Sequence, residues 1–179
     1  ADSLISKEKS QSLWIYTADC IPILIADIKT RNIAACHSGL RGLKNKIISK
    51  TLKRLLEIGS TKNNLIFAIG PSINGEKYQV KTEDIYRLIF EITGESNLAE
   101  SYFLSGFNKF EPIILYKKSS KPNRFLFDIQ AAAVLQLYKE GIKQSQINLS
   151  RLCTYSNPKL FNSYRRNRTI LRQWSCIYS

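Results

Sequence analysis

The first quarter of the chain contains two short apolar runs separated by a polar segment. Ile21–Ala26 is rich in β-branched side chains, residues 27–32 are polar, and Ile33–Cys36 is apolar again. Runs of this length on either side of a polar turn are typical of a β-hairpin. A hairpin brings its two ends together, so Cys20 and His37 are expected to lie side by side although they are seventeen positions apart. Any fold of this chain must accommodate that pairing.

A thiolate and an imidazole at adjacent strand ends allow two kinds of chemistry. They can form a nucleophile–base pair, with Cys20 as nucleophile and His37 as base, or they can provide two ligands of a zinc site. A lone cysteine is more often a small buried hydrophobe, so the functional interpretations stay open at this point. His37 is the only histidine in the chain, and it begins a Ser-Gly-Leu-Arg-Gly turn of the kind that often carries exposed chemistry.

The length of 179 residues fits a single domain over residues 1–179, and it is sufficient to bury a substantial core. Hydrophobic residues make up 44% and charged residues 23%, which is typical of a globular protein. No apolar run approaches the roughly 18 residues that a membrane helix needs, and residues 1–10 do not resemble a signal peptide. The chain begins with Ala1 and contains no methionine, so we expect it to be part of a longer protein whose N-terminal segment is missing.

The four cysteines lie within apolar runs, in a chain too large to need a disulfide framework. We therefore expect reduced thiols in a cytoplasmic protein, with Cys36 and Cys176 in the core. The net charge of +13 suggests an anionic partner, either nucleic acid or an anionic small molecule. No RNA-binding signature or zinc-finger spacing accompanies the charge, so nucleic-acid binding is the less favoured interpretation.

Apolar residues recur at helical spacing in three segments, which are Leu43–Ile58, Thr82–Thr93 and Ile129–Glu140. We expect Thr82 to cap the second helix, and Gly59 and Gly141 to end the first and the third. Strand-like apolar runs occupy five further segments, which are Leu13–Tyr16, Leu65–Ile69, Pro112–Tyr116, Ile147–Leu149 and Thr169–Tyr178. Residues 117–123 are expected to form a basic loop.

Six short motifs follow one another along the chain. They are Thr17–Pro22 (Thr-Ala-Asp-Cys-Ile-Pro), His37–Gly42 (His-Ser-Gly-Leu-Arg-Gly), Gly70–Ile73 (Gly-Pro-Ser-Ile), Tyr78–Val80 (Tyr-Gln-Val), the pair Cys153 and Thr154, and Ser163–Arg166 (Ser-Tyr-Arg-Arg). In this order they resemble the laccase-domain family (YfiH-like proteins), whose members are described as polyphenol oxidases and as purine nucleoside phosphorylases. The resemblance covers nearly the whole chain. It implies an α+β fold with mixed β-sheets and flanking helices, in a single domain of the CNF/YfiH-like type.

The resemblance also implies a mononuclear zinc site with Cys20 and His37 as ligands. The third family ligand is a histidine in a Gln-Val-His motif, at a position that falls before Ala1. Zinc with three protein ligands keeps one position open for water or substrate. Copper is less favoured, because a multicopper centre needs many histidines and this chain has one. Leu40 stands where the family usually has tryptophan, so we expect the pocket wall to differ.

The activity that the resemblance implies is phosphorolysis of adenosine, inosine and methylthioadenosine to the base and ribose 1-phosphate, with adenosine deamination as a further activity. A purine nucleoside and phosphate would then be the partners. Arg41 and Arg165, or its neighbour Arg166, could bind phosphate bidentately, and Asp19 could orient a ligand or move a proton. A copper-dependent polyphenol oxidase and a metal-free hydrolase with a cysteine–histidine pair are the alternatives.

For three other motif residues, the sequence predicts a role less definitely. Tyr78 could stack on a purine base, although an aromatic side chain is more often largely buried. Cys153 and Ser163 lie in the motifs, but the chemistry of their side chains predicts no particular role.

Overall fold

The structure is a computed structural model that describes residues 2–94, 101–104 and 113–179. Its largest sheet, the main sheet, has five strands in the order β1-β4-β3-β5-β10. They are β1 (Ser3–Ser6), β4 (Ile33–Ser38), β3 (Ile21–Asp27), β5 (Leu65–Ile69) and β10 (Ile147–Leu149). The strands β3 and β4 form the predicted antiparallel hairpin, and β10 joins β5 in parallel orientation.

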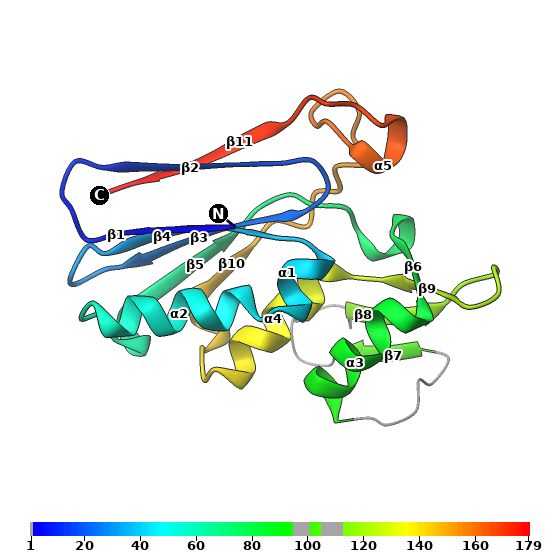
Figure 1. Ribbon diagram of the computed structural model, residues 1–179, viewed down its shortest axis with the longest axis horizontal. Helices are drawn as coiled ribbons and strands as arrows, with labels where there is room; N and C mark the ends of the chain where they lie inside the picture. Colours follow the sequence, from blue (N-terminus) through cyan, green and yellow to red (C-terminus); the bar gives the residue numbers. More distant parts are fainter. Residues whose placement is uncertain (1, 95–100, 105–112) are drawn as a thin grey trace.

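A two-stranded antiparallel ribbon lies over one face of the main sheet (Figure 1). It pairs β2 (Ser12–Thr17) with β11 (Gln173–Tyr178), so the two ends of the sequence meet in one element. Side chains alternate between the faces of each strand. The inward residues Leu13 and Ile15 therefore pack against Ile33 and Ala35 of the main sheet in a small hydrophobic core.

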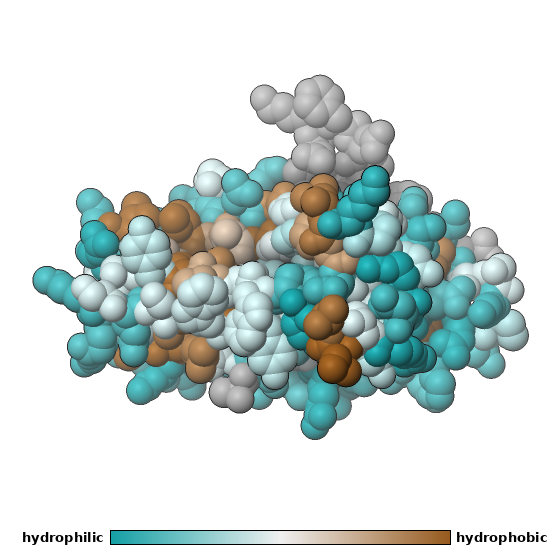
Figure 2. All heavy atoms as spheres, turned by 90° about the horizontal axis from the view of Figure 1, so that it is seen from above, coloured by the Kyte–Doolittle hydropathy of each residue, from teal (hydrophilic) through white to brown (hydrophobic). Residues whose placement is uncertain are grey.

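The outer face of the ribbon carries exposed aromatic side chains, which are Trp14, Tyr16, Trp174 and Tyr178. The Trp174 ring makes edge contacts with Tyr16 and Trp14, at centroid distances of 5.1 and 6.5 Å. The prediction that Cys176 is a core residue is wrong, because its pairing with Trp14 places it on this outer face, where it is half-buried. Seen from the ribbon side, the surface mixes hydrophilic areas with separate hydrophobic patches (Figure 2).

A four-stranded antiparallel sheet lies beside the main sheet and has the order β6-β9-β8-β7 (Figure 1). Its strands are β6 (Gln79–Lys81), β9 (Arg124–Phe127), β8 (Ile113–Lys118) and β7 (Ser101–Leu104). The expected strand at 112–116 corresponds to β8, although Pro112 lies outside the described residues. Lys117 and Lys118 pair with β9, so the strand continues into the predicted basic loop and shortens it.

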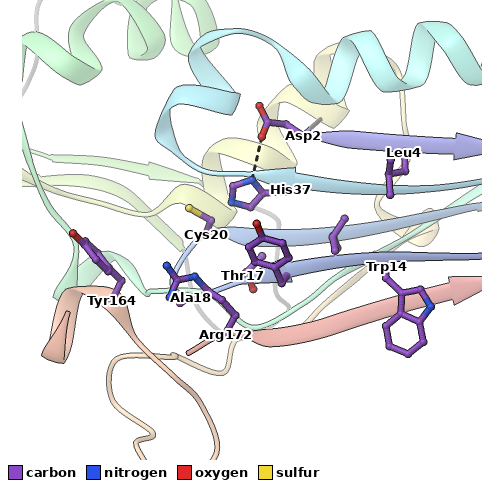
Figure 3. Close-up of a pocket in the computed structure, with 11 residues that line it drawn as sticks. Asp2, Leu4, Trp14, Thr17, Ala18, Cys20, His37, Tyr164 and Arg172 are labelled. Carbon is purple, nitrogen blue, oxygen red and sulfur yellow. Dashed lines mark ion pairs between the residues drawn. The ribbon is translucent and has the colours of Figure 1, made fainter. Parts of the chain in front are cut away.

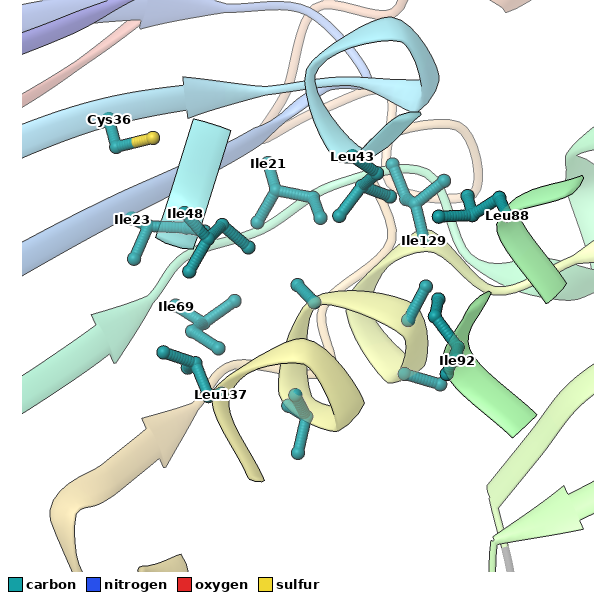
Figure 4. Close-up of a cluster of buried hydrophobic side chains, with 14 of the residues drawn as sticks. Ile21, Ile23, Cys36, Leu43, Ile48, Ile69, Leu88, Ile92, Ile129 and Leu137 are labelled. Atoms are coloured by element: carbon teal, nitrogen blue, oxygen red, sulfur yellow. The ribbon is translucent and has the colours of Figure 1, made fainter. Parts of the chain in front are cut away.

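Three helices, α1 (Leu40–Lys44), α2 (Ile47–Glu57) and α4 (Ile129–Lys139), lie on the side of the main sheet opposite the ribbon (Figure 1). Helix α3 (Thr82–Thr93) lies beside the four-stranded sheet, and α5 (Tyr164–Asn167) lies near the end of the ribbon (Figure 1). Short 3₁₀ turns are formed by Lys62–Asn64, Gly75–Lys77 and Gln144–Gln146. The large core joins Ile23 and Ile69 of the sheet to Ile48 of α2 and Leu137 of α4 (Figure 4). Within the described ranges, none of the helices has both the length and the apolar character to span a bilayer.

The first predicted helix is divided in two. The prediction of one helix over 43–58 is wrong, because Lys46 adopts a left-handed conformation with φ 55° and separates α1 from α2. The apolar spacing continues across this break, since Leu43 and Ile48 both enter the core. The expected end of the segment is confirmed: Gly59 has φ +100° directly after the last turn of α2.

The other two predicted helices are confirmed as α3 and α4, with small differences at their ends. The N-cap position of α3 is Lys81 instead of Thr82, which is the first helical residue. The α4 helix ends at Lys139, and Gly141 follows it with φ +83°. Its N-cap is Asp128, whose carboxylate accepts a hydrogen bond from the backbone N–H of Ala131.

Candidate active site

The end of the β3–β4 hairpin brings Cys20 and His37 together. Pro22 pairs with His37 and Ile21 with Ser38, so Cys20, which directly precedes β3, lies at the same end of the sheet as His37. Figure 3 shows the thiol beside the imidazole. The expected proximity of the two side chains is confirmed. It depends on the register of the two apolar strands, because a slip of one residue would turn each side chain to the other face.

The two side chains lie in a pocket of about 520 Å³ that is bordered by the ribbon. It is lined by Asp2, Leu4, residues 14–18, Cys20, His37, Tyr164 and Arg172. Small-molecule sites commonly have volumes of roughly 300–1,000 Å³. The pocket therefore has room for a ligand of nucleoside size.

His37 is oriented by Asp2 at the start of the chain. Its Nδ1 lies 3.5 Å from Oδ1 of Asp2, and its backbone N–H donates to the carbonyl oxygen of Asp2 at 2.8 Å. The second ring nitrogen faces Cys20 (Figure 3). A carboxylate at one nitrogen of a histidine favours the tautomer that leaves the other nitrogen free as an acceptor or ligand. The contact with Asp2 therefore favours the tautomer in which Nε2 of His37, on the side of the Cys20 thiol, is free to act as an acceptor or ligand.

Burial raises the pKa of the Cys20 thiol from 9.0 to about 11. The negative charge of Asp19 raises this pKa further, whereas the positive charge of Arg172 lowers it. Gly39 contacts the thiol so closely that an added Cβ would lie 2.6 Å from Sγ, so a side chain at that position would displace the sulfur. Burial outweighs the effect of Arg172, so Cys20 is a neutral thiol at pH 7.

The donor chemistry of this pair fits a zinc site, but only in part. Zinc binds cysteine sulfur and histidine nitrogen, usually in tetrahedral sites. Nowhere in the described part of the chain do three or more His, Cys, Asp or Glu side chains come close enough to hold a metal ion together. Cys20 and His37 can thus provide two ligands, and a complete site needs at least one donor from outside the described residues.

Asp19 joins three distant segments next to Cys20. Its buried carboxylate accepts hydrogen bonds from Oγ1 of Thr154 and from the backbone N–H of Arg165, both at 2.7 Å. Its own carbonyl accepts from the backbone N–H of Ile73 at 2.9 Å. Asp19 itself has φ 89°, a left-handed conformation that few residues other than glycine adopt. Both carboxylate oxygens are occupied by protein donors, so the side chain is arranged to hold the loops around Cys20.

The two arginines predicted to bind phosphate lie outside the pocket lining. Arg41 is exposed at the start of α1. Arg165 stacks over the half-buried ring of Tyr78 at 5.0 Å, and its Nη1 donates to the carbonyl oxygen of Gln79 at 3.3 Å. Phosphate binding by these arginines and a proton-transfer role for Asp19 remain predictions.

The remaining motif residues support the local structure. The guanidinium of Arg166 donates to three carbonyl oxygens, of Thr154, Tyr155 and Phe161. Ser163 caps α5 by accepting a hydrogen bond from the backbone N–H of Arg166 at 3.2 Å. The sulfur of Cys153 accepts from the backbone N–H of Asn74 at 3.4 Å. These contacts fold the C-terminal loop against the loop after β5.

Sequence reasoning identified Cys20 and His37 as site residues, but it did not identify others that line the pocket, such as Asp2, Tyr164 and Arg172. The charge pattern places Arg172 in a basic cluster near the end of the chain, but charge alone does not say which of its arginines faces a ligand. The pairing of β11 with β2 decides this, and it joins residues from opposite ends of the sequence.

Comparison with known proteins places the chain in one family. The family model described as multi-copper polyphenol oxidoreductase laccase matches residues 1–179. A purine nucleoside phosphorylase of Synechocystis sp. is 35% identical over 181 residues, which cover 100% of this chain and 68% of the relative. A purine nucleoside phosphorylase of Bacteroides thetaiotaomicron is 33% identical over 166 residues, covering 92% and 55%.

Solved structures agree in fold. YlmD from Geobacillus stearothermophilus superposes with a TM-score of 0.83 at 26% identity, covering 99% of this chain and 60% of that protein. YfiH from Bacillus licheniformis gives a TM-score of 0.79 at 24% identity, covering 98% and 60%. The chain thus spans between 55% and 68% of the length of these relatives. On its sequence, its fold and the matched motifs, the chain belongs to the laccase-like family that is described as multi-copper polyphenol oxidoreductase laccase and includes the YfiH-type proteins.

Proposed function

We propose that this chain provides the catalytic site of a zinc-dependent purine nucleoside phosphorylase, acting on adenosine, inosine and methylthioadenosine. The single observation that carries the proposal is the position of Cys20 and His37 side by side in a nucleoside-sized pocket. Relatives that cover nearly the whole chain are named purine nucleoside phosphorylase, which supports an enzyme that acts on nucleosides. Adenosine deamination at the same site is part of the proposal, because a metal-activated water also suits attack at purine C6.

In this reaction a phosphate oxygen attacks C1′ of the ribose and the bond from C1′ to the purine nitrogen breaks. The electron pair of that bond goes to the purine, which takes up a proton. When bound, zinc supplies a Lewis acid and an open coordination position. Cys20 and His37 would hold it, together with a third ligand that we place in an N-terminal segment of the whole protein.

The other pocket residues bind and orient. Tyr164 lines the pocket on the side of Arg172, and its ring offers a stacking surface for a purine. Asp2 holds Nδ1 of His37, which leaves Nε2 for the metal. Asp19 keeps the loop before Cys20 in place through its bonds to the C-terminal segment.

Two features of the site make the alternative functions less suitable. A metal-free hydrolase needs a thiolate at neutral pH, whereas burial raises the pKa of Cys20 to about 11. A multicopper oxidase needs many imidazole ligands, and this stretch of the protein supplies only His37.

The test compares Cys20→Ala with Cys176→Ala in the full-length protein. Cys176 is a half-buried thiol on the outer face of the ribbon, outside the pocket lining, so it controls for the loss of a cysteine as such. Zinc per chain is measured by mass spectrometry, and base release from inosine and phosphate is measured on the same samples.

We expect roughly one equivalent of zinc in the wild type and in Cys176→Ala, since the site binds one ion. Cys20→Ala should lose most of the zinc and release base at least about 100-fold more slowly, because removal of a ligand leaves an incomplete site. Zinc content and phosphorolysis that persist in Cys20→Ala would contradict the proposal.

A further inference from the structure

Arg172 is the one lysine or arginine among the described residues that line the pocket. This is notable in a chain with 27 lysines and arginines, because most of them lie elsewhere on the surface. Arg172 is half-buried at the residue before β11, whereas Arg41 and Arg165 are exposed. The permanent positive charge inside the pocket therefore comes from a residue outside the matched motifs.

The guanidinium of Arg172 is held in a fixed position. Its Nη1 donates to the carbonyl oxygens of Thr169 and Leu171, both at 2.9 Å. Its Nε and Nη2 have no hydrogen-bond partner among the residues that the structure describes. Nε and Nη2 are the adjacent donors that bind two oxygens of a phosphate or carboxylate in parallel. The side chain is thus immobilised through one nitrogen while its bidentate edge stays available.

The charges in the pocket are separated in space. Asp2 and His37 lie on one side, Arg172 and Tyr164 lie on the other, and Cys20 is between them (Figure 3). An anion would be repelled by the carboxylate of Asp2 and attracted to the guanidinium of Arg172. A ligand that spans the pocket would therefore place its negative group at the Arg172 end.

We propose that Arg172 binds inorganic phosphate, the second substrate, through Nε and Nη2. This inference rests on the proposed phosphorylase function and assigns a binding residue to it. It also orients the reaction, because phosphate at Arg172 lies on the opposite side of Cys20 from Asp2. Arg172 makes this contact inside the pocket, where neither Arg41 nor Arg165 lines the wall.

The experiment measures phosphate binding directly and phosphorolysis separately, using the full-length protein loaded with zinc. Inorganic phosphate is titrated into the wild type, Arg172→Gln, Arg172→Lys and Arg54→Gln, with binding followed by calorimetry. Arg54 is a matched control, because it is an exposed arginine of α2 that pairs only with Glu57 in the described residues. Melting temperatures of all four proteins verify the fold, since Arg172→Gln also removes the two bonds that hold the loop before β11.

We expect Arg172→Gln to weaken phosphate binding at least about 30-fold and to raise the KM for phosphate similarly, with a smaller change in KM for inosine. Arg172→Lys keeps the charge but loses the bidentate geometry, so its affinity should fall about tenfold. Arg54→Gln should bind as the wild type does. In a second titration, a purine 5′-monophosphate replaces inorganic phosphate. Any contribution of Arg172 to its affinity should be no larger than the contribution of Arg172 to phosphate affinity.

Three results would overturn the assignment. They are unchanged phosphate affinity in Arg172→Gln or in Arg172→Lys, absence of phosphate binding in the wild type, and an Arg172-dependent preference for the mononucleotide. Phosphate binding that depends on Arg172 in a protein that does not cleave nucleosides would refute the proposed function and leave the anion site supported. The two proposals therefore fail separately.

Discussion

At the scale of single residues, the Asp19 carboxylate combines burial with two hydrogen bonds at 2.7 Å. It lies directly beside Cys20, and each of its oxygens already accepts a hydrogen bond from another segment of the protein. A carboxylate in this state stabilises the fold at the place where the chemistry is expected. We therefore expect loss of this carboxylate to lower the stability of the protein directly, and to affect catalysis only through the fold.

Asp19→Asn tests this interpretation. An amide has one acceptor oxygen and carries no charge. If that oxygen accepts from the Arg165 N–H, the amide N–H₂ faces Thr154, whose hydroxyl loses its charged acceptor and can only accept in return. We expect the free energy of unfolding to fall by about 1.5–3 kcal/mol, the range for bonds to charged groups. Urea unfolding at neutral pH measures the loss.

The partner variant Thr154→Val completes a double-mutant cycle. Because the two side chains contact each other, the double variant should lose less than the sum of the single variants, by about 0.5–3 kcal/mol. Additive losses, or an Asp19→Asn protein as stable as the wild type, would show that the carboxylate does not hold the loops together.

At the scale of elements, the break between α1 and α2 depends on Lys46. A non-glycine residue in the left-handed region is strained by about 1–2 kcal/mol, whereas glycine adopts that region freely. The ion pair of Lys46 with Glu91, at 3.4 Å on the surface, is worth little in comparison.

Lys46→Gly should therefore raise the free energy of unfolding by about 0.5–1 kcal/mol, after the entropy cost of glycine is subtracted. The melting temperature should rise by about 2 °C. The matched control is Lys50→Gly, an exposed position within α2, where glycine should lower stability by about 1 kcal/mol. Equal destabilisation by both substitutions would mean that Lys46 is not strained.

Elements with a strong local pattern could be predicted from the sequence. The boundaries of β5 and α3 coincide with the expected Leu65–Ile69 and Thr82–Thr93, because apolar periodicity and flanking turn residues act within a few positions. The break at Lys46 could not be predicted in this way. The apolar positions continue through it, and lysine gives no signal for a left-handed backbone.

The same distinction applies to the site. The proximity of Cys20 and His37 was predictable, because a hairpin is a local structure. The position of Arg172 was not, because it requires β11 to pair with β2, and no local pattern specifies which distant strand is the partner. The packing of Tyr78 under Arg165 likewise joins segments that only the tertiary structure brings together.

At the scale of the whole molecule, the main sheet separates two cores. The larger core faces the helices and includes Cys36, which is fully buried in β4. Burial raises the pKa of this thiol from 9.0 to about 11. A thiol with a raised pKa in the folded state stabilises folding below the pKa of the unfolded thiol, and this contribution is lost as the pH rises through the folded pKa.

The free energy of unfolding should therefore fall between about pH 9 and pH 11, and ionisation of Cys36 should account for part of this fall. Two pKa units correspond to about 2–3 kcal/mol. Cys36→Ala removes this ionisable group, so its free energy of unfolding should decline less steeply over the same pH range. Urea unfolding from pH 7 to pH 11 compares the two slopes. Parallel curves for the wild type and Cys36→Ala would contradict a role for this thiol in alkaline unfolding.

The bonds that Asp19 makes to Thr154 and Arg165 span 135 and 146 positions of the sequence. On a translating ribosome, the hairpin that joins Cys20 to His37 emerges early and forms within microseconds. The segment that closes the pocket follows about 10–30 s later, at usual synthesis rates. During that interval the nascent chain carries a thiol and an imidazole side by side without the loops that bury them. A growing chain of this protein therefore exposes the thiol of Cys20 and the imidazole of His37 to the cell before the pocket around them has formed.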